Sequence, residues 1–373
     1  MKVLHISKFY PPVNGGIETA ARELTEGLNR LGVQTDVLCA NLVPRTEQDG
    51  GTNGYRIVRA ASLGLAFSTS VSPMLIALAR KMLADRDVVH VHMPNPLAAV
   101  ALWLLRPRCA VVLHWHSDVV RQRLTLKLYQ PLQRWIVDRA GAIVVTSSAY
   151  ADASQVLNGS ARGKVHVIPI GIRDPSLSVD ERAVSALRAT YGARKIVLAV
   201  GRMAHYKGFD LLIDAAAELP SDVHVVIVGG GQLLHEHREH IRRRRLGSKV
   251  TMTGTLPQAE LLHHYAAADV FCMPSTNRAE AYGLAMLEAM AMGKPIVTLD
   301  IEGSGVNWVN SDGITGMTVH TRQPAELAGA LAGLTGDRLT VARMGAAARS
   351  RFLEHFQADE MSRRMIDVYR AIA

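Results

Sequence analysis

"RAEAYGLAMLEAMAMGKPIV", residues 278–297, consists of a loop, a glycine, a helix rich in Ala, Met and Leu, and a Gly-Lys-Pro that leads into a strand. Glu280 stands at the mouth of the apolar run and Glu288 inside it. An eight-residue offset returns a side chain to within about 80° of the same helix face. Two solvated charges would be the simplest explanation, but the run "LAMLEAMAM" is typical of a buried helix, where an unpaired carboxylate is costly.

The start of this helix is a candidate binding site. We expect Tyr282, Gly283 and Leu284 to be its first residues. The N–H groups at a helix start have no partner within the helix, so these would be free to hold a phosphate or hydroxyl groups. Glu280 lies on the loop just before them. A carboxylate only accepts hydrogen bonds, so it suits hydroxyl donors better than a phosphate.

Short β-branched runs alternate with longer helical patterns along the first half of the chain, as in parallel βαβ units. Residues 17–31 have the Leu/Ala spacing of a helix, with Gly32 just past its end. Strands are predicted at residues 2–7, 34–40, 87–92, 110–116, 142–147 and 165–170.

The same pattern restarts after residues 169–180, "PIGIRDPSLSVD", which we interpret as a linker. A second set of strands is predicted at residues 195–200, 224–229, 250–254, 270–275 and 294–300. The last 35 or so residues are helical in pattern. The fold class is therefore α/β, with two Rossmann-like domains in tandem.

The composition indicates a globular chain of two ordinary domains: 373 residues, 48% hydrophobic and 20% charged. The longest apolar run, residues 97–105, is about half the length that spans a bilayer. "MKVLHIS" leads directly into a strand pattern, so we expect no signal peptide. Cys39, Cys109 and Cys272 are far apart in apolar runs and are expected to be buried free thiols, as in a reducing compartment.

The net charge of +9 is unevenly distributed. Residues 1–172 contain 19 Lys/Arg and 11 Asp/Glu, whereas residues 173–373 contain 23 and 22. A basic half implies an acidic partner, which could be nucleic acid, an anionic membrane or a phosphorylated substrate. Few aromatic residues and no nucleic-acid-binding motif are present, so we expect no nucleic acid.

In open parallel sheets, ligands bind at the carboxyl ends of the strands. Gly15-Gly16 follows the first strand and would let backbone approach a ligand, although a plain tight turn explains it equally well. His116 would project from the end of a strand toward a ligand, although a lone histidine is more often a satisfied structural residue, whereas His114 is expected to be buried in the sheet. Arg202 and Lys207, in "GRMAHYKG", flank a loop that enters a helix and suit a diphosphate; two solvated cations are the alternative.

Four other motifs carry little weight. "VGGGQLL" (228–234) lacks the spacing of a dinucleotide fingerprint. "DRD" (85–87) lies at the entrance of a strand, which is the wrong end for a ligand, and "HEHREH" (235–240) does not match the zinc motif H-E-x-x-H. "RRRR" (242–245) is most simply a solvated helix face. We therefore predict no metal site and no cofactor.

Taken together, the motifs resemble those of the retaining, GT-B-fold glycosyltransferases of family 4. The matching segments occur in the family's order over nearly the whole chain and are "PPVNGGIE", "DVVHVH", "HWHSD", "GRMAHYKG", "VTMTGTL" and "EAYGLAMLEAMAMGKPIV". Residues 303–319 further resemble bacterial mannosyl- and rhamnosyltransferases that build O-antigen or other surface polysaccharides. Two departures are Tyr282, where the family usually has Phe, and "PIGIR" (169–173) in place of Pro-Asn-Gly-Val-Asp.

The resemblance implies two Rossmann-like domains facing each other across a cleft. Residues 1–172 would bind the acceptor and residues 173–373 the nucleotide sugar, with a terminal helix at about 353–373 packing back on the first domain. Glu280 would bind hydroxyls of the sugar and Glu288 those of the ribose, while Arg202 and Lys207 would hold the diphosphate. The remaining contacts implied are the N–H groups of Tyr282, Gly283 and Leu284 for sugar and phosphate, Gly15 and Gly16 for the donor phosphate, His116 for the sugar, and the backbone of Gly254, Thr255 and Leu256 for the base.

The implied activity is transfer of a hexose, mannose or a 6-deoxyhexose such as rhamnose, from a GDP-linked donor to a lipid diphosphate-linked or other glycan acceptor, with retention and without a metal. A UDP-sugar-dependent transferase acting on a different acceptor and a nucleotide-sugar epimerase of the same fold are the alternatives. A dinucleotide-dependent oxidoreductase would need a glycine fingerprint, which neither half of the chain contains. A non-catalytic sugar-binding subunit would tolerate loss of Glu280 and Arg202, and both are present.

The basic first half suits the anionic inner face of the cytoplasmic membrane, so we expect a cytoplasmic protein with peripheral membrane contact. Residues 121–137, "RQRLTLKLYQPLQRWIV", form a mixed basic and apolar helix that is a candidate for this contact, and packing within the domain is the alternative. The sequence leaves the oligomeric state open.

Overall fold

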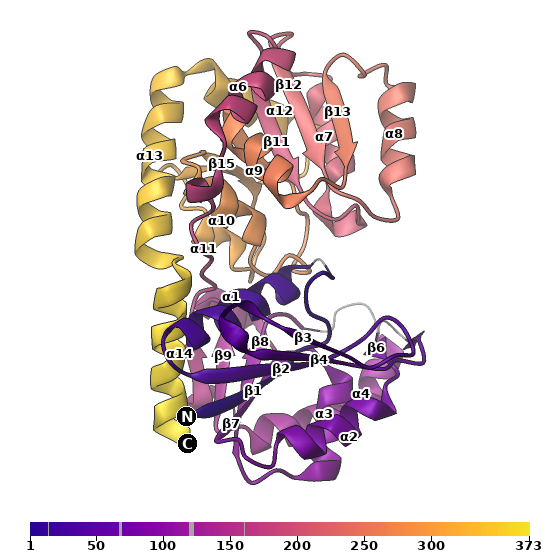
Figure 1. Cartoon of the computed structure of the whole chain (residues 1–373). Helices are drawn as coiled ribbons and strands as arrows, with labels where there is room; N and C mark the ends of the chain where they lie inside the picture. Colours follow the sequence, from indigo (N-terminus) through magenta and orange to yellow (C-terminus); the bar gives the residue numbers. More distant parts are fainter. Residues whose placement is uncertain (14, 67–68, 119–122, 160) are drawn as a thin grey trace. The chain divides into compact units, whose positions relative to one another are not determined.

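The computed structural model describes residues 1–13, 15–66, 69–118, 123–159 and 161–373 (Figure 1). These residues form two compact units: Met1–Arg173 together with Gln357–Ala373, and Asp174–Phe356. The sequence placed the boundary one residue earlier, after residue 172. The long C-terminal helical region is divided at residues 356–357, between α13 (Arg338–His355) and α14 (Ala358–Ile372).

The first unit is built on an eight-stranded sheet in the order β10-β9-β8-β7-β1-β2-β4-β3. Every pair of neighbours is parallel except β3 with β4. The strands are β1 (Lys2–Ile6), β2 (Gln34–Ala40), β3 (Glu47–Gly50), β4 (Arg56–Ala60), β7 (Val88–Met93), β8 (Ala110–Trp115), β9 (Ala142–Val145) and β10 (Val165–Val167).

All six strands predicted in the first half are present, with ends that differ by at most three residues. β3 and β4 were not predicted, and neither was the small hairpin of β5 (Leu65–Ala66) and β6 (Thr69–Ser70). β3 has the sequence EQDG and lies at the edge of the sheet, and β4 (RIVRA) carries an arginine at each end of its apolar centre. Charged edge strands resist pairing with other chains, and for the same reason they lack the apolar signal of a buried strand.

The helices of the first unit are α1 (Gly16–Arg30), α2 (Pro73–Met82), α3 (Pro96–Leu105), α4 (Arg123–Arg139), α5 (Ser148–Ala153) and α14. Figure 1 shows α2, α3 and α4 together on one face of the sheet and α1 beside α14 on the other. Gly27 lets α1 and α14 approach closely, because a Cβ there would stand 2.1 Å from Ser362 Oγ. Ile172, within the "PIGIR" segment, pairs with Gln357 at the start of this packing.

The second unit has a six-stranded, all-parallel sheet in the order β13-β12-β11-β14-β15-β16. Its strands are β11 (Lys195–Val200), β12 (Val223–Val228), β13 (Val250–Gly254), β14 (Val270–Met273), β15 (Ile296–Leu299) and β16 (Gly316–Val319). The five predicted strands are present, and β16 was missed. It begins at Gly316, where a Cβ would stand 1.8 Å from Ile296 O, and glycine is unusual in a strand.

Helices connect these strands, as expected for consecutive βαβ units. They are α6 (Glu181–Thr190), α7 (Phe209–Ala216), α8 (Leu234–Arg243), α9 (Gln258–Ala267), α10 (Leu284–Ala291), α11 (Val306–Val309), α12 (Pro324–Gly336) and α13. The interior is an aliphatic cluster in which strand residues such as Val197, Val225 and Val297 pack with Leu212 of α7 and Leu331 of α12. The prediction of two Rossmann-like units is confirmed.

Two smaller expectations concern membranes and thiols. Within the described ranges, no helix has both the length and the apolar character needed to cross a bilayer. All three cysteines are free; Cys39 and Cys272 are buried as predicted, and Cys109 is partly buried.

Candidate active site

Four loops of the second unit lie next to one another at the carboxyl ends of β13, β12, β11 and β14, which are neighbours in the sheet. Backbone hydrogen bonds connect them: Gly229 N–H donates to Gly254 O (2.9 Å), Met203 N–H to Gly230 O (2.8 Å), and Thr276 N–H to Tyr206 O (2.8 Å). Most of the predicted nucleotide-binding residues are on these loops. The sheet therefore brings together loops that are far apart in the chain, such as those of Lys207 and Glu280, which are separated by 73 residues.

Lys207 and Glu280 form an ion pair at this edge. Lys207 Nζ donates to Glu280 Oε2 at 2.5 Å, and Ser275 Oγ donates to the same oxygen at 2.9 Å. Both side chains are close to buried, with 12% and 10% of their surfaces exposed. Burial lowers the pKa of Lys207, but the Glu280 carboxylate and Tyr206 together more than offset this and hold the pKa above its ordinary value. Both residues were predicted to bind the ligand, Lys207 through the diphosphate and Glu280 through sugar hydroxyls. The structure shows in addition that they form an ion pair with each other.

The loop that carries Glu280 is anchored by a segment from further along the chain. Ser304 Oγ donates to Glu280 O at 2.5 Å, Gly305 N–H donates to Ala281 O at 2.9 Å, and Arg278 Nε donates to Gly303 O at 3.1 Å. Sequence reasoning missed the supporting residues Ser275 and Ser304, because a lone serine carries no signal of its own. Residues 303–305 therefore fix the position of the Glu280 backbone.

The predicted start of the helix after Glu280 is wrong by two residues. α10 begins at Leu284, and Gly283 precedes it with a φ of 85°. A Cβ on Gly283 would also stand 2.7 Å from Met286 Cε and 2.9 Å from Met273 Sδ, the ends of two flexible side chains, so it is the backbone conformation that requires glycine. The Tyr282 side chain is buried among Trp308 and Phe356. Only the backbone of Tyr282 is left to contact a ligand.

Arg202 lies on the same edge as Lys207 and is exposed. Its positive charge acts on Lys207, whose pKa it lowers slightly against the effect of Glu280. Among the residues that the structure describes, none forms a hydrogen bond or an ion pair with the Arg202 guanidinium. An exposed cation without a counter-charge, next to a buried ion pair, is suited to an anionic ligand.

Glu288 differs from the expectation of two buried carboxylates. Glu280 is only 7% exposed, but Glu288, on α10, is partly exposed. Glu288 lies near Tyr265 of α9: burial raises the pKa of the Tyr265 phenol well above its ordinary value, and the Glu288 carboxylate adds to this. Its location on α10 leaves a role toward a ligand open.

The glycines of "VGGG" (228–231) have a packing function. Gly229 has a φ of 141°, and a Cβ there would stand 1.9 Å from Gly201 O. Gly230 packs against Thr255, with 2.5 Å between the position of its Cβ and Thr255 Oγ1. Gly254 is buried and ends β13, while Thr255 is exposed and Leu256 partly exposed. The loops after β12 and β13 are therefore held against each other.

In the first unit, Gly15 precedes α1 and Gly16 is the first helical residue. The φ of Gly15 is −178°, which any residue can adopt. A Cβ there would meet the Glu18 carboxylate at 2.2 Å, which a flexible side chain could relieve. The backbone conformation of Gly15 therefore does not explain why glycine stands there. Asn14, which belongs to the same motif, lies outside the described residues.

His116 follows β8 and is 5% exposed. Its Nε2 lies 2.9 Å from His92 Nδ1, and its ring stacks on that of His114 with centroids 4.1 Å apart. Burial, and then the neighbouring His114, hold the pKa of His116 well below its ordinary value. His114 is fully buried, as predicted. His116 is therefore neutral near pH 7.

His116 belongs to a buried cluster of five imidazoles that the sequence analysis did not predict: His5, His90, His92, His114 and His116. His5 pairs with His90 across β1 and β7, and His92 pairs with His114 across β7 and β8. The signal was the spacing of two in "VHVHM" and "LHWH". That spacing places histidines on one face of each strand, but only the register brings the strands' histidines together.

Three members of this cluster, His90, His92 and His114, have nitrogens within 4.8 Å of one another, and they form the one group in the described ranges that could hold a metal ion. Ligand nitrogens on a tetrahedral zinc are about 3.3 Å apart, given Zn–N bonds of about 2.0–2.1 Å. The His92 and His114 rings stack on each other, whereas metal ligands must point their ring nitrogens at a common centre. The rings would have to turn to bind an ion.

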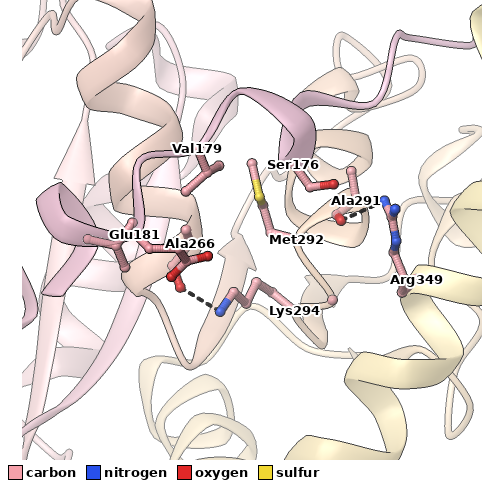
Figure 2. Close-up of a pocket in the computed structure, with 10 residues that line it drawn as sticks. Ser176, Val179, Glu181, Ala266, Ala291, Met292, Lys294 and Arg349 are labelled. Carbon is pink, nitrogen blue, oxygen red and sulfur yellow. Dashed lines mark hydrogen bonds between the residues drawn. The ribbon is translucent and has the colours of Figure 1, made fainter.

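Two cavities lie away from these edges. In the second unit, a cavity of about 360 Å³ is lined by Ser176, Met292, Lys294 and Arg349 among others (Figure 2). Figure 2 shows Lys294 Nζ donating to Ala266 O and Arg349 to Ala291 O, at the ends of α9 and α10. Lys294 precedes β15, so this cavity is at the amino edge of the sheet, opposite the candidate site. A cavity of about 770 Å³ in the first unit, lined by Met1, Asp87 and Arg139 among others, is likewise at the amino edge.

The first unit carries the entire net positive charge of the chain. Met1–Arg173 with Gln357–Ala373 contains 23 Lys/Arg and 14 Asp/Glu, a net charge of +9, whereas Asp174–Phe356 contains 19 of each. Of the helix proposed for membrane contact, Arg121 and Gln122 lie outside the described residues. α4 covers the rest of that segment.

Comparison with known proteins gives the chain its relatives. The family model "Glycosyltransferase Family 4" matches residues 14–174, and "Glycosyl transferases group 1" matches residues 184–351. The chain is 32% identical to O-antigen chain mannosyltransferase C of Escherichia coli, over 100% of this chain and 99% of the relative. It is also 32% identical to the D-rhamnosyltransferase WbpZ of Pseudomonas aeruginosa, over 96% and 93%.

Solved structures show the same fold. Sucrose-phosphate synthase from Thermosynechococcus elongatus superposes with a TM-score of 0.84 at 22% identity, covering 99% of this chain and 98% of that one. Anabaena Alr3699/HepE, in complex with UDP and glucose, gives a TM-score of 0.81 at 19% identity over the whole of both chains. At these identities the likeness extends to the fold alone.

Proposed function

The chain belongs to the glycosyltransferases of group 1 and family 4, and from this membership we propose that it transfers a hexose from a nucleoside diphosphate sugar to a hydroxyl group of a glycan acceptor. The observation that carries the proposal is the cationic edge of the second unit, with the buried Lys207–Glu280 pair and the exposed Arg202. Membership gives the class of reaction. This edge provides the groups for the chemistry.

Departure of the nucleoside diphosphate leaves negative charge on its terminal phosphate. Lys207 carries three N–H donors, of which Glu280 takes one, so the others remain for phosphate oxygens. The Arg202 guanidinium can donate two further hydrogen bonds to the phosphate, and no carboxylate of the described residues has to be displaced from it first. Charges already in position stabilise the developing charge without reorganisation. We propose that these cations replace a divalent metal ion.

We further propose retention at the anomeric carbon. The acceptor would attack from the face that the diphosphate leaves, and the leaving phosphate oxygen would take the acceptor's proton. Glu280 is paired with Lys207 and buried, which is a poor arrangement for a nucleophile that must form a covalent sugar intermediate. Same-face attack therefore requires fewer groups than a double displacement.

The remaining site residues keep their proposed roles. Glu280 would accept from sugar hydroxyls, Glu288 would accept from the ribose, and the N–H groups near Tyr282, Gly283 and Leu284 would contact sugar and phosphate. The base would lie against Gly254, Thr255 and Leu256. Gly15 and Gly16 would contact the donor phosphate and His116 the sugar.

The donor is proposed to be a GDP-linked mannose or 6-deoxyhexose. The support comes from relatives: an O-antigen chain mannosyltransferase, a D-rhamnosyltransferase, and a GDP-mannose-dependent mannosyltransferase of Mycobacterium tuberculosis that is 27% identical over 99% of this chain. The acceptor is proposed to be a growing surface polysaccharide, which the similarity to an O-antigen chain mannosyltransferase supports. A lipid diphosphate carrier is proposed from the basic charge of the first unit.

Replacing Arg202 with alanine should lower kcat by about tenfold or more, because a cation that meets the developing phosphate charge is removed. The measurement is release of GDP from GDP-mannose in the presence of acceptor, with and without EDTA. Wild-type turnover should be unchanged by EDTA. Arg338→Ala, an exposed arginine at the start of α13, is the control and should behave as wild type. Activity that disappears on chelation would refute the metal-free proposal.

A thermal-shift screen of nucleoside diphosphates and their sugars should identify the donor, since a ligand that binds the folded state raises Tm by mass action. We expect GDP and GDP-mannose to give the largest shifts. Glu288→Gln should reduce the GDP shift while leaving kcat at saturating donor close to wild type. A larger shift with UDP-sugars would replace the GDP assignment by the UDP alternative.

We propose that the first unit contacts an anionic membrane peripherally. Its charge of +9 supports this, as do the exposed Trp103 and Leu104 at the end of α3, which are followed by the exposed Arg106 and Arg108. The protein should float with anionic vesicles at low salt and less at high salt, and Trp103→Ser/Leu104→Ser should weaken flotation. Leu339→Ser, an exposed leucine of the second unit, should not. Equal flotation with neutral vesicles, or none with either kind, would reject the proposal.

A further inference from the structure

The five buried histidines of the first unit form a hydrogen-bonded network with Thr25 and Tyr369. The donor and the acceptor of each hydrogen bond in this network can be assigned. His5 comes from β1, His90 and His92 from β7, His114 from β8, and His116 follows β8. Thr25 is on α1 and Tyr369 on α14. All belong to one compact unit, so their distances can be used together.

Each of the five rings is neutral near pH 7. Burial lowers the pKa of His5 and of His114 to about 3, and it holds the pKa values of His90, His92 and His116 well below the ordinary value. A neutral imidazole has one N–H donor and one nitrogen lone pair. Fixing the donor on one ring therefore fixes the role of each nitrogen that faces it on the next ring.

Thr25 sets the direction. Its Oγ1 lies 2.7 Å from Ala21 O and 2.9 Å from His5 Nδ1. Two oxygen atoms at 2.7 Å need a hydrogen between them, and a carbonyl oxygen can only accept. The single hydrogen of the Thr25 hydroxyl therefore goes to Ala21 O. Thr25 Oγ1 must then accept from His5, which places the hydrogen of His5 on Nδ1.

From His5 the chain continues through Tyr369. His5 Nε2, now a lone pair, accepts from the Tyr369 hydroxyl at 3.2 Å, and that oxygen accepts from His90 Nδ1–H at 2.7 Å. His90 Nε2 in turn accepts from His114 Nδ1–H at 3.3 Å. The chain ends at His114 Nε2 as a lone pair, a buried atom that has no hydrogen-bond partner among the described residues.

The opposite direction is less favourable at both ends. Thr25 would give its hydrogen to His5 in place of Ala21 O. Every ring would then reverse, and the chain would end at His114 with a buried N–H that has no acceptor. Buried N–H groups without a partner are rarer in proteins than acceptors with an unused lone pair. Both ends of the network therefore favour the same direction.

The assignment extends to His92 and His116. His92 Nε2 faces His5 Nδ1 at 3.5 Å. Because that nitrogen of His5 carries the hydrogen, His92 must present a lone pair there and carry its own hydrogen on Nδ1. His92 Nδ1–H then donates to His116 Nε2 at 2.9 Å, so the hydrogen of His116 is on Nδ1.

We propose that His116 is held in the Nδ1–H form and meets its ligand as a hydrogen-bond donor, with Thr25, His5 and His92 as positioning residues. The identity of that ligand as an oxygen of the transferred hexose rests on the proposed function. A donor at this position binds a hydroxyl or ring oxygen and takes no proton from the acceptor. The proton of the acceptor then has the leaving phosphate as its destination, as same-face transfer requires.

The test is the tautomer itself. Long-range 1H–15N spectra of the whole chain, labelled with 15N-histidine, distinguish protonated from unprotonated ring nitrogens, and His116 is identified as the signal lost in His116→Asn. We expect Nδ1 of His116 to be protonated and Nε2 unprotonated. A His116 protonated at Nε2, or at both nitrogens, near pH 7 would overturn the proposal. This readout needs no donor or acceptor, so a chain without transferase activity would refute the proposed function and leave this result standing.

A matched pair of variants tests the positioning role. Thr25→Ser keeps the hydroxyl and should keep the wild-type tautomer of His116. Thr25→Val has nearly the same shape without the oxygen, and should give a mixture of His116 tautomers and a severalfold lower kcat with KM for the donor unchanged. If Thr25→Val leaves the His116 spectrum as in wild type, or if Thr25→Ser changes it as much as Thr25→Val does, Thr25 does not set the direction.

Discussion

Lys207→Met is expected to lower kcat by about 10²-fold or more, because removing one preorganised donor to a developing anion typically costs about 10²–10³ in rate. Methionine keeps most of the aliphatic stem of Lys207 and removes the ammonium group. Glu280 would also lose the cation that balances it in a nearly buried position. Breaking a buried pair from one side costs about 3–5 kcal/mol, so Tm should fall as well.

The double variant Lys207→Met/Glu280→Gln separates these two effects. Replacing both charges removes the unpaired carboxylate, so Tm should recover toward the wild-type value while kcat stays low. Lys195→Met is the control, since Lys195 is at the opposite end of β11 in a more exposed pair with Asp222 at 3.0 Å. A Lys207→Met enzyme that loses stability but turns over like wild type would reduce the ion pair to a structural role.

Glu280→Gln is expected to lower kcat by about 10–100-fold with a smaller change in the apparent affinity for the nucleotide. The glutamine carbonyl can still accept from Ser275 Oγ, which donates to Glu280 at 2.9 Å, so the loop should keep its position. The negative charge that pairs with Lys207, and that is proposed to accept from sugar hydroxyls, is lost. Steady-state kinetics with varied donor concentration give kcat and KM separately.

Glu218→Gln is the matched control, because Glu218 is an exposed carboxylate just after α7, at the amino edge of the same sheet. It should leave both constants unchanged. The roles of the two glutamates would be exchanged if Glu280→Gln mainly weakened the nucleotide and Glu288→Gln mainly lowered turnover.

The central strands of both sheets were predictable because each is a continuous apolar run, such as KIVLAV at β11, which buried parallel strands require. The missed strands lack that run: β3 is charged and β16 begins with a glycine. The position of Gly283 before α10 was also missed. Helix periodicity does not reveal where the left-handed residue before a helix falls.

The candidate site was predictable as residues but not as contacts. Lys207 and Glu280 are 73 positions apart. Each could be recognised separately, as a charged residue on a loop near the end of a predicted strand. Their pairing depends on β11 and β14 being neighbours in the sheet, an order that the sequence does not state. The histidine cluster was missed for the same reason, since it follows from the register of three neighbouring strands.

The pairing changes the meaning of the two glutamates of α10 and its preceding loop. Glu280 is buried because Lys207 and Ser275 satisfy it before any ligand arrives. Glu288 is partly exposed, so water can also solvate its carboxylate. The proposed roles, turnover for Glu280 and nucleotide binding for Glu288, therefore start from a preformed ion pair at the first position and a more accessible carboxylate at the second.

The most direct test of the account is the anomeric configuration of the product. The purified chain is incubated in EDTA with α-linked GDP-mannose and a synthetic lipid diphosphate-linked oligosaccharide that ends in mannose, and the product is examined by NMR. We expect GDP release matched by a new α-linked mannose on the acceptor. A β-linked product, or a converted sugar nucleotide without any glycan product, would contradict it.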